Sequence, residues 1–195
     1  MPRGVAIPEP RQQLFAAVER VIAADGPVRL TGRAVTREAG VATGLLYAHF
    51  ADFDDFLTGY AVDRAFQLAA AVAGLPDRAG TGTVAGNLAD ALLAVPLDGL
   101  LPLTRLTAAK PELAAAVRDV LGERTAGLEA VEAAAARYLA AEQRLGRVPA
   151  GADTEALALA AVAVLHHVAL TASDGARVRR AIAALAGGFP VATGS

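Results

Sequence analysis

Residues 43–48 carry side chains that are suited to contacts with the edges of DNA bases. The hydroxyl of Thr43 can hydrogen-bond a base edge or a phosphate, and Leu45 and Ala48 can contact the methyl group of thymine. Gly44 and Ala48 are small enough to let a helix approach another surface closely. These residue types therefore favour recognition of a nucleic acid.

A turn at residues 39–41 would present this segment as a rigid rod. Ala39 is small enough for close packing of two helices, and Gly40 can take the left-handed conformation that ends the first of them. Val41 then points back into the corner. A helix held in this way fits the major groove of B-DNA, although the corner by itself is equally compatible with an ordinary helical hairpin.

Helical geometry separates the inner face of this segment from its outer face. Leu46 and Phe50 lie one turn apart and are expected to face the core together with Val35 and Val41. The side chains left toward the groove are Thr43, Gly44, Tyr47 and Ala48. Few side chains would therefore read the base sequence, and phosphate contacts would set the register.

The composition is that of a helical protein with one domain, or with one small and one medium domain. Of 195 residues, 54% are hydrophobic and 5% are aromatic, which favours packed helices. Cysteine is absent, so disulfides and thiolate metal ligands are excluded. The net charge is −2, although the first 50 residues hold six arginines against four acidic side chains. This local balance of +2 is a weak electrostatic footprint for DNA binding.

Apolar spacing predicts an all-α fold of about nine helices and no sheet. Thr31 and Asp52 are expected to cap the helices that follow them, and either Asp153 or Thr154 is expected to cap the penultimate helix. The predicted helices cover about 10–25, 32–39, 42–50, 52–72, 83–95, 98–108, 112–144, 154–173 and 174–187.

The segment 154–173 is apolar nearly all round and is expected to be covered on every side. Its unbroken apolar run, 156–165, is shorter than the roughly 20 residues that cross a membrane, so we interpret it as a buried helix, with a transmembrane span as the minor alternative. A monomer of this size could bury both this helix and the last one, but the simpler solution is that the two helices pack on a second copy of the chain as a four-helix bundle. The residues expected in this two-fold interface are Leu157, Val164, His167, Val178, Ile182 and Leu185.

The order and spacing of the first helices resemble the N-terminal DNA-binding domain of the TetR family of transcriptional regulators. An apolar-periodic helix over 14–26 is followed by a Thr-led helix over 31–41 that ends Ala-Gly-Val. A short helix with a late tyrosine, 43–50, and an acidic helix start, 52–57, complete the pattern. The match covers roughly residues 11–60, and the remaining chain is similar to the family only in its helical style.

The resemblance implies a division of the chain and a set of partners. Residues 1–9 would be a flexible tail, 10–52 a helix-turn-helix DNA-binding domain, and 53–195 a helical effector-binding and dimerisation domain. The partners would be double-stranded operator DNA, an unknown small-molecule effector and a second copy of the chain, with no membrane and no cofactor. The implied protein is a cytoplasmic regulator, commonly a repressor that its effector releases from DNA, and not an enzyme.

The resemblance also implies individual contacts with the DNA backbone. Tyr47 and His49 match family positions that usually touch phosphates, and Thr31 and Arg33 match positions that anchor on the other side of the groove. The sequence departs from the family at Ala42, which cannot cap a helix. It departs again at residues 53–55, where Phe-Asp-Asp replaces a phosphate-binding lysine start. A helical small-molecule-binding protein with weak or lost DNA binding is therefore the alternative.

An effector pocket of the family type would lie among the helices of the second domain. Most apolar candidates are explained equally well as core, and Arg105 is explained better as a solvent-facing side chain with its stem on the core. The candidate residues are Tyr60, Arg64, Phe66, Leu100, Leu103, Arg105, Tyr138 and His166.

Other chemistry has little support in the sequence. His166 and His167 are adjacent on a helix and point about 100° apart, so they cannot easily share a metal ion. The glycines of 80–86 do not have the spacing of a dinucleotide fingerprint and follow no strand, so we interpret the segment as a loop. An enzyme built on a helical bundle has no motif in its favour.

Overall fold

The computed structural model describes residues 9–122, 127–171 and 175–187, and these residues form helices without a strand. The all-α prediction is thereby confirmed for this part of the chain. Two short 3-10 turns, η1 (Pro27–Arg29) and η2 (Pro76–Arg78), accompany ten α-helices. The helices are α1 (Pro10–Asp25), α2 (Gly32–Ala39), α3 (Thr43–His49), α4 (Phe53–Val72), α5 (Val84–Leu93), α6 (Leu97–Ala109), α7 (Pro111–Leu121), α8 (Gly127–Arg144), α9 (Thr154–Leu170) and α10 (Gly175–Gly187).

The predicted helix over 112–144 is the main error, because the structure divides it into α7 and α8. Gly122 ends α7 with φ 90° and ψ 167°, a backbone conformation that no right-handed helix can pass through. The described residues therefore contain ten α-helices and not nine. The predicted start of the last helix, Asp174, lies outside the described residues, and α10 is described from Gly175.

The predicted caps are confirmed. The Thr31 side chain accepts a hydrogen bond from the backbone N–H of Ala34, and the Asp52 side chain accepts one from Asp55. At the start of α9 the cap is Asp153 rather than Thr154. Each cap satisfies a backbone donor that the first helical turn leaves without a partner.

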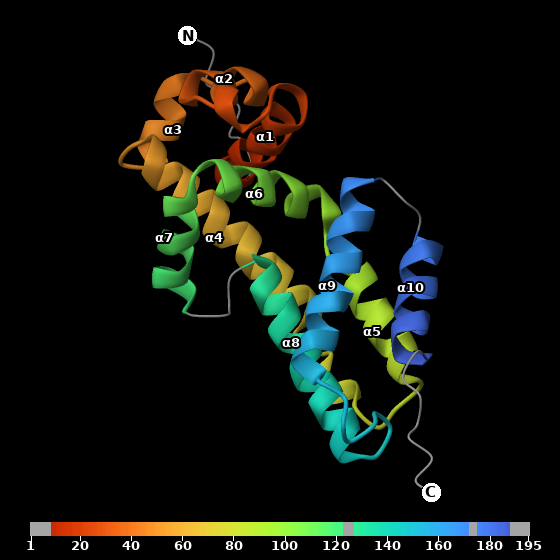
Figure 1. The fold of residues 1–195 in the computed structure, drawn as a ribbon. Coiled ribbons are helices and arrows are strands. Elements are labelled where there is room, and N and C mark those ends of the chain that lie inside the picture. The colour runs from red at the N-terminus through yellow and green to blue at the C-terminus, as the bar shows by residue number, and fades with distance from the viewer. Residues whose placement is uncertain (1–8, 123–126, 172–174, 188–195) are drawn as a thin grey trace, which may run out of the picture.

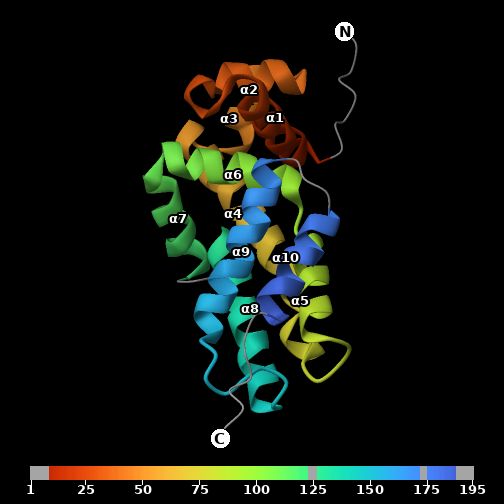
Figure 2. The ribbon, with the colours of Figure 1, turned by 45° about the vertical axis from the view of Figure 1, so that its right-hand side comes forward.

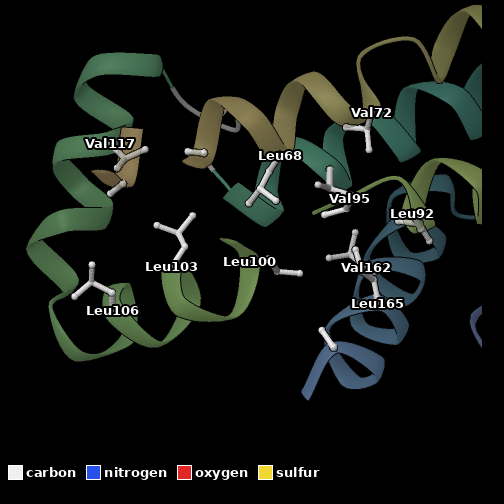
Figure 3. Close-up of a cluster of buried hydrophobic side chains, with 14 of the residues drawn as sticks. Leu68, Val72, Leu92, Val95, Leu100, Leu103, Leu106, Val117, Val162 and Leu165 are labelled. Atoms are coloured by element: carbon white, nitrogen blue, oxygen red, sulfur yellow. The ribbon is translucent and has the colours of Figure 1, made fainter. Parts of the chain in front are cut away.

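The helices form an elongated molecule with α1, α2 and α3 at one end, as Figure 1 shows. Helix α4 runs from that end into the body, where it contacts α7 and α8. One continuous core extends through both regions, and Figure 3 shows the part in the body. The leucine and valine side chains labelled in Figure 3 come from α4, α5, α6, α7 and α9, together with Val95 between α5 and α6.

Helix α9 is not covered on every side within a single chain. Leu159 and Leu170 are 57% and 53% exposed, and Ala156, Ala163 and His167 on the same face are also exposed. The side that carries α9 and α10 faces the viewer in Figure 2. A single copy of the chain therefore leaves an apolar stripe on α9 in contact with solvent.

No single described helix is both long and apolar enough to cross a membrane. The pair α5 and α6 passes that test only when the two helices are taken together, and they are bent by 73° at their junction.

Candidate nucleic-acid interface

The corner between α2 and α3 has the conformation that the sequence predicts. Gly40 has φ 68° and ψ 29°, and its N–H bonds the carbonyl of Arg37 at 3.1 Å. The N–H of Val41 bonds the carbonyl of Thr36 at 3.0 Å, which closes the helix end. The left-handed residue reverses the chain within two positions, so α3 leaves the corner at a fixed angle to α2.

Helix α3 has one face in the core and one face in solvent. Leu46 is fully buried and Phe50, directly after the helix, is 5% exposed. Phe50 packs against Phe15 of α1 and Phe56 of α4, with ring centroids 6.1 and 5.1 Å away. Leu45 is half-buried, and the exposed residues of the short helix are Thr43, Gly44, Tyr47, Ala48 and His49.

Tyr47 reaches back to the first turn of α2. Its hydroxyl lies 3.3 Å from the position that a Cβ atom would occupy on Gly32, and Phe53 lies on the same side at 3.6 Å. Thr31 and Arg33, which flank Gly32, are both exposed. The start of α2 and the tyrosine of α3 therefore form one continuous polar edge.

Three arginines line a hollow of about 730 Å³ beside this edge, together with Thr31. Arg33 and Arg37 belong to α2 and Arg29 to η1, and all three are exposed. Within the described part of the chain, none of the three forms an ion pair. Sequence reasoning missed Arg29 and Arg37 as site residues, although their spacing of four from Arg33 was a usable signal.

The acidic start of α4 is occupied by contacts within the chain. Asp55 accepts a hydrogen bond from the N–H of Ala51 at 2.9 Å, while its own N–H bonds Asp52. Asp54 pairs with Lys110, at the junction of α6 and α7, at 3.2 Å. The side chain of Phe53 stacks on Phe56. These residues therefore stabilise the start of α4. At the start of α3, Ala42 provides no side-chain cap, as the sequence predicts.

Comparisons with known proteins agree with this geometry at the level of fold. No protein-family model and no curated protein sequence matches the chain. Among solved structures, the fatty acid degradation regulator FadR from Bacillus halodurans has a TM-score of 0.70 at 18% identity, covering 95% of this chain and 99% of that one. FadR from Bacillus subtilis, solved with stearoyl-CoA, has a TM-score of 0.69 at 16% identity, covering 91% and 98%. The TetR-family regulator PfmR from Thermus thermophilus has 0.69 at 13%, covering 89% and 96%.

This chain has the fold of the TetR-family regulators. The resemblance inferred from residues 11–60 thus extends over the whole helical architecture, including the part that carried no sequence motif.

In this TetR fold the predicted effector residues do not form a single site. Leu103 lines a hollow of about 130 Å³ between α4, α6, α7 and α8. Arg105 is exposed and lines a different hollow, between α1 and α6. Tyr138 is fully buried and accepts a hydrogen bond from Asn87 at 3.2 Å, and burial raises its pKa to about 12. His166, on α9, is half-buried.

The other predicted effector residues lie at the junction between the head, which is formed by α1, α2 and α3, and the body, in the core, or on the surface of α4. Arg64 donates through Nε to Glu19 of α1 at 2.6 Å and through Nη1 to Gln12 at 3.1 Å. Burial is the largest single effect and opposes its charge, but the hydrogen bond with Glu19 and the negative charges of Glu19 and Asp63 together outweigh burial and raise the pKa of the guanidinium. Leu100 belongs to the core, and Phe66 is 63% exposed on α4.

Tyr60 lies in the same junction and is fully buried beside Phe15. Its hydroxyl has no hydrogen-bond partner among the described residues. Burial, reinforced by the charge of Glu19, raises the pKa of Tyr60 well above its usual value. Tyr60 and Arg64 therefore belong to the contact between α1 and α4 and do not line the hollow that contains Leu103.

The residues expected at the two-fold interface differ in exposure. Val178 and Ile182 are fully buried within one chain, where α10 contacts α5 and α9. Leu157 and Leu185 are half-buried along a narrow apolar hollow of about 60 Å³ between α5, α8, α9 and α10. Val164 is half-buried, and His167 is exposed on α9. The described residues contain no group of three or more acidic, histidine or cysteine side chains placed to hold a metal ion.

Proposed function

We propose that this protein is a sequence-specific DNA-binding transcriptional regulator that acts as a homodimer and is released from its operator by a small-molecule effector. The observation that carries the proposal is the outer face of α3. Its residues are exposed, while Leu46 and Phe50 anchor the same segment in the core. A short helix that is rigidly held and open on one face is the element that enters a major groove.

The edges of this helix supply what phosphate binding requires. Thr31, Arg33, Tyr47 and His49 are exposed donors on the two sides of α3, and Arg29 and Arg37 extend the positive charge. Guanidiniums that pair with no acidic side chain among the described residues are available to phosphate oxygens. Residues 10–52 would form the DNA-binding unit, in the cytoplasm, where the DNA is accessible. A net charge of −2 limits the number of phosphate contacts per subunit, so we expect a shallow salt dependence.

The effector would bind in the hollow between α4, α6, α7 and α8. Ala61, Ala65, Leu103 and Val117 form its apolar walls, and Thr104, Thr107, Arg118 and Glu129 supply its polar groups. Small alanine side chains on α4 leave this space, and a ligand that exceeded it would push α6 away from α4. Leu103 is the only one of the six candidates Tyr60, Arg64, Leu103, Arg105, Tyr138 and His166 that lines this hollow.

A contact between α6 and the head would connect effector binding to release of the protein from DNA. A Cβ atom on Gly99, in the first turn of α6, would lie 3.2 Å from Cδ of Arg64 and 3.5 Å from Oε1 of Glu19. Helix α6 therefore rests directly on the ion pair that joins α1 to α4. A ligand that moves α6 would shift this support, and would favour the released state by its differential affinity for it.

A second copy would cover the exposed stripe of α9. The stripe includes Leu159, Ala163, His167 and Leu170, and α10 lies alongside. Two copies joined by residues 154–186 would hold two α3 helices at a fixed separation. DNA half-sites would then lie about one helical turn, ~34–36 Å, or a multiple of it apart.

Selection of bound duplexes from a random DNA pool tests the proposal. We expect the full chain to enrich a sequence with two related half-sites. A pool that remains unenriched, with a protein that is folded by circular dichroism, would contradict DNA recognition and favour the alternative of a small-molecule-binding protein without a DNA target.

A further inference from the structure

The hydroxyl hydrogen of Thr36 is directed to its own helix. Thr36 lies on α2 and is 2% exposed. Its Oγ1 is 2.9 Å from the carbonyl oxygen of Gly32 and 3.4 Å from that of Arg33. Carbonyl oxygens only accept, and a threonine hydroxyl has a single hydrogen, so Thr36 is the donor in these contacts. The remaining hydrogen-bonding capacity of Thr36 is that of an acceptor.

Thr36 also contacts the first residue of α3. Its Oγ1 lies 3.3 Å from Oγ1 of Thr43, a distance at which either hydroxyl could donate. Because the hydrogen of Thr36 already points to its own helix, the donor in this pair is Thr43. The hydroxyl hydrogen of Thr43 is therefore directed inward, toward α2.

This assignment fixes what Thr43 offers to a partner in solvent. Thr43 is exposed, and with its hydrogen turned inward its oxygen presents only lone pairs outward. Phosphate oxygens accept hydrogen bonds, as do O6 and N7 of guanine and O4 of thymine, so none of these can pair with it. In the major groove, the donors are the exocyclic amino groups, N6 of adenine and N4 of cytosine.

We propose that Thr43 is a specificity-determining residue that accepts a hydrogen bond from the amino group of an adenine or cytosine, with Thr36 setting its direction. The inference rests on the proposed function, because it requires α3 to lie in the major groove. It assigns Thr43 to base reading, and leaves anchoring on phosphates to the residues at the edges of α3. A single net hydrogen bond of this kind gives about fivefold discrimination at one position.

Base preferences selected by variants from a random pool test this assignment. The wild type should enrich adenine or cytosine at one position of each half-site. Thr36→Val removes the inner acceptor, which frees the Thr43 hydrogen to turn outward, so that guanine and thymine become tolerated there. Thr36→Ser keeps the hydroxyl and should keep the wild-type preference.

A second pair of variants covers the case in which Thr36→Val does not fold. Thr43 is on the surface, so Thr43→Val and Thr43→Ser leave the core intact. Thr43→Val should lose the preference at that one position by about fivefold, while Thr43→Ser should retain it. If the wild type selects DNA but Thr43→Val keeps every base preference, the inference is wrong and the proposed function stands. If the wild type selects no DNA, the proposed function fails and this inference fails with it.

Discussion

Tyr47 shows how a single side chain in the candidate interface depends on the residue beneath it. The hydroxyl fits over Gly32 because that residue has no Cβ atom. Sequence alone predicted that Tyr47 points outward, since Leu46 and Phe50 define the inner face by their spacing. It could not predict the contact with Gly32, which depends on the angle between two helices. Arg29 was missed as a neighbour of Arg33 for a related reason, because η1 was not predicted.

Gly32→Ala should weaken DNA binding without unfolding the protein. The new methyl group would lie 3.3 Å from the Tyr47 hydroxyl, which would have to shift by a few tenths of an ångström from the position that we assign to phosphate contact. Loss of one phosphate contact corresponds to about a fivefold rise in Kd, which fluorescence anisotropy with a selected duplex would measure. Alanine is more favourable than glycine in a helix, so the free energy of unfolding should not fall.

Gly74→Ala is the matched control for this variant. Gly74 follows α4 and has no atom near its missing Cβ position. Its Kd for DNA should equal that of the wild type. Equal affinity of Gly32→Ala and the wild type would refute the role of Tyr47 as a phosphate contact.

At the scale of helices, the contact among α1, α4 and α6 was the part least accessible to sequence reasoning. The helices themselves could be predicted from apolar spacing and caps. The contacts between them could not, and Arg64 was therefore expected near a ligand. Its partner is Glu19, which is 45 positions away and carries no local signal. The break between α7 and α8 was equally hard to predict from the sequence. A glycine can bend, end or continue a helix, and its backbone angles determine which of these occurs.

Glu19→Ala should destabilise the protein, because it leaves a mostly buried guanidinium without its main partner. The side chains of Arg64 and Glu19 are 10% and 18% exposed. Removing one member of a fully buried pair costs about 3–5 kcal/mol. Because Asp63 still pairs with Arg64, we expect a loss of about 2 kcal/mol in the free energy of unfolding by urea denaturation.

Glu38→Ala is the control, because it removes an ion pair with the same N–O distance on the surface of the protein. The pair of Arg20 and Glu38 is also 2.6 Å long, but its side chains are 52% and 42% exposed. Solvent screening limits such a pair to less than about 1 kcal/mol. Equal losses in the two variants would mean that the junction of head and body does not depend on the buried pair.

For the whole molecule, the exposed stripe of α9 decides whether the two DNA-binding ends of a dimer can be held apart. The sequence predicted that residues 154–173 need cover on every side, and a single chain does not supply it. It also placed Val178 and Ile182 at the expected interface, whereas both are buried within one chain. Periodicity identifies an apolar face but does not tell whether its partner is the same chain or another.

Leu159→Glu should convert the dimer to a monomer. The substitution places a charge within the stripe, and a second copy could pack there only by removing that charge from water. Light scattering at micromolar concentration would measure the molar mass. Val120→Glu on α7, where the side chain is 62% exposed, is the control that should remain dimeric. A wild-type chain that is itself monomeric under these conditions would overturn the proposed interface.

The most direct measurement is an anisotropy titration of a selected duplex with the wild type and with the double variant Thr43→Ala and Tyr47→Ala. Both side chains are exposed on α3, so their removal should leave the fold and the dimer intact by light scattering. We predict that the double variant binds the selected duplex about 25-fold more weakly, the product of two fivefold losses, and no longer discriminates at the base position that Thr43 reads. Unchanged specific affinity of the double variant would show that α3 does not read the DNA.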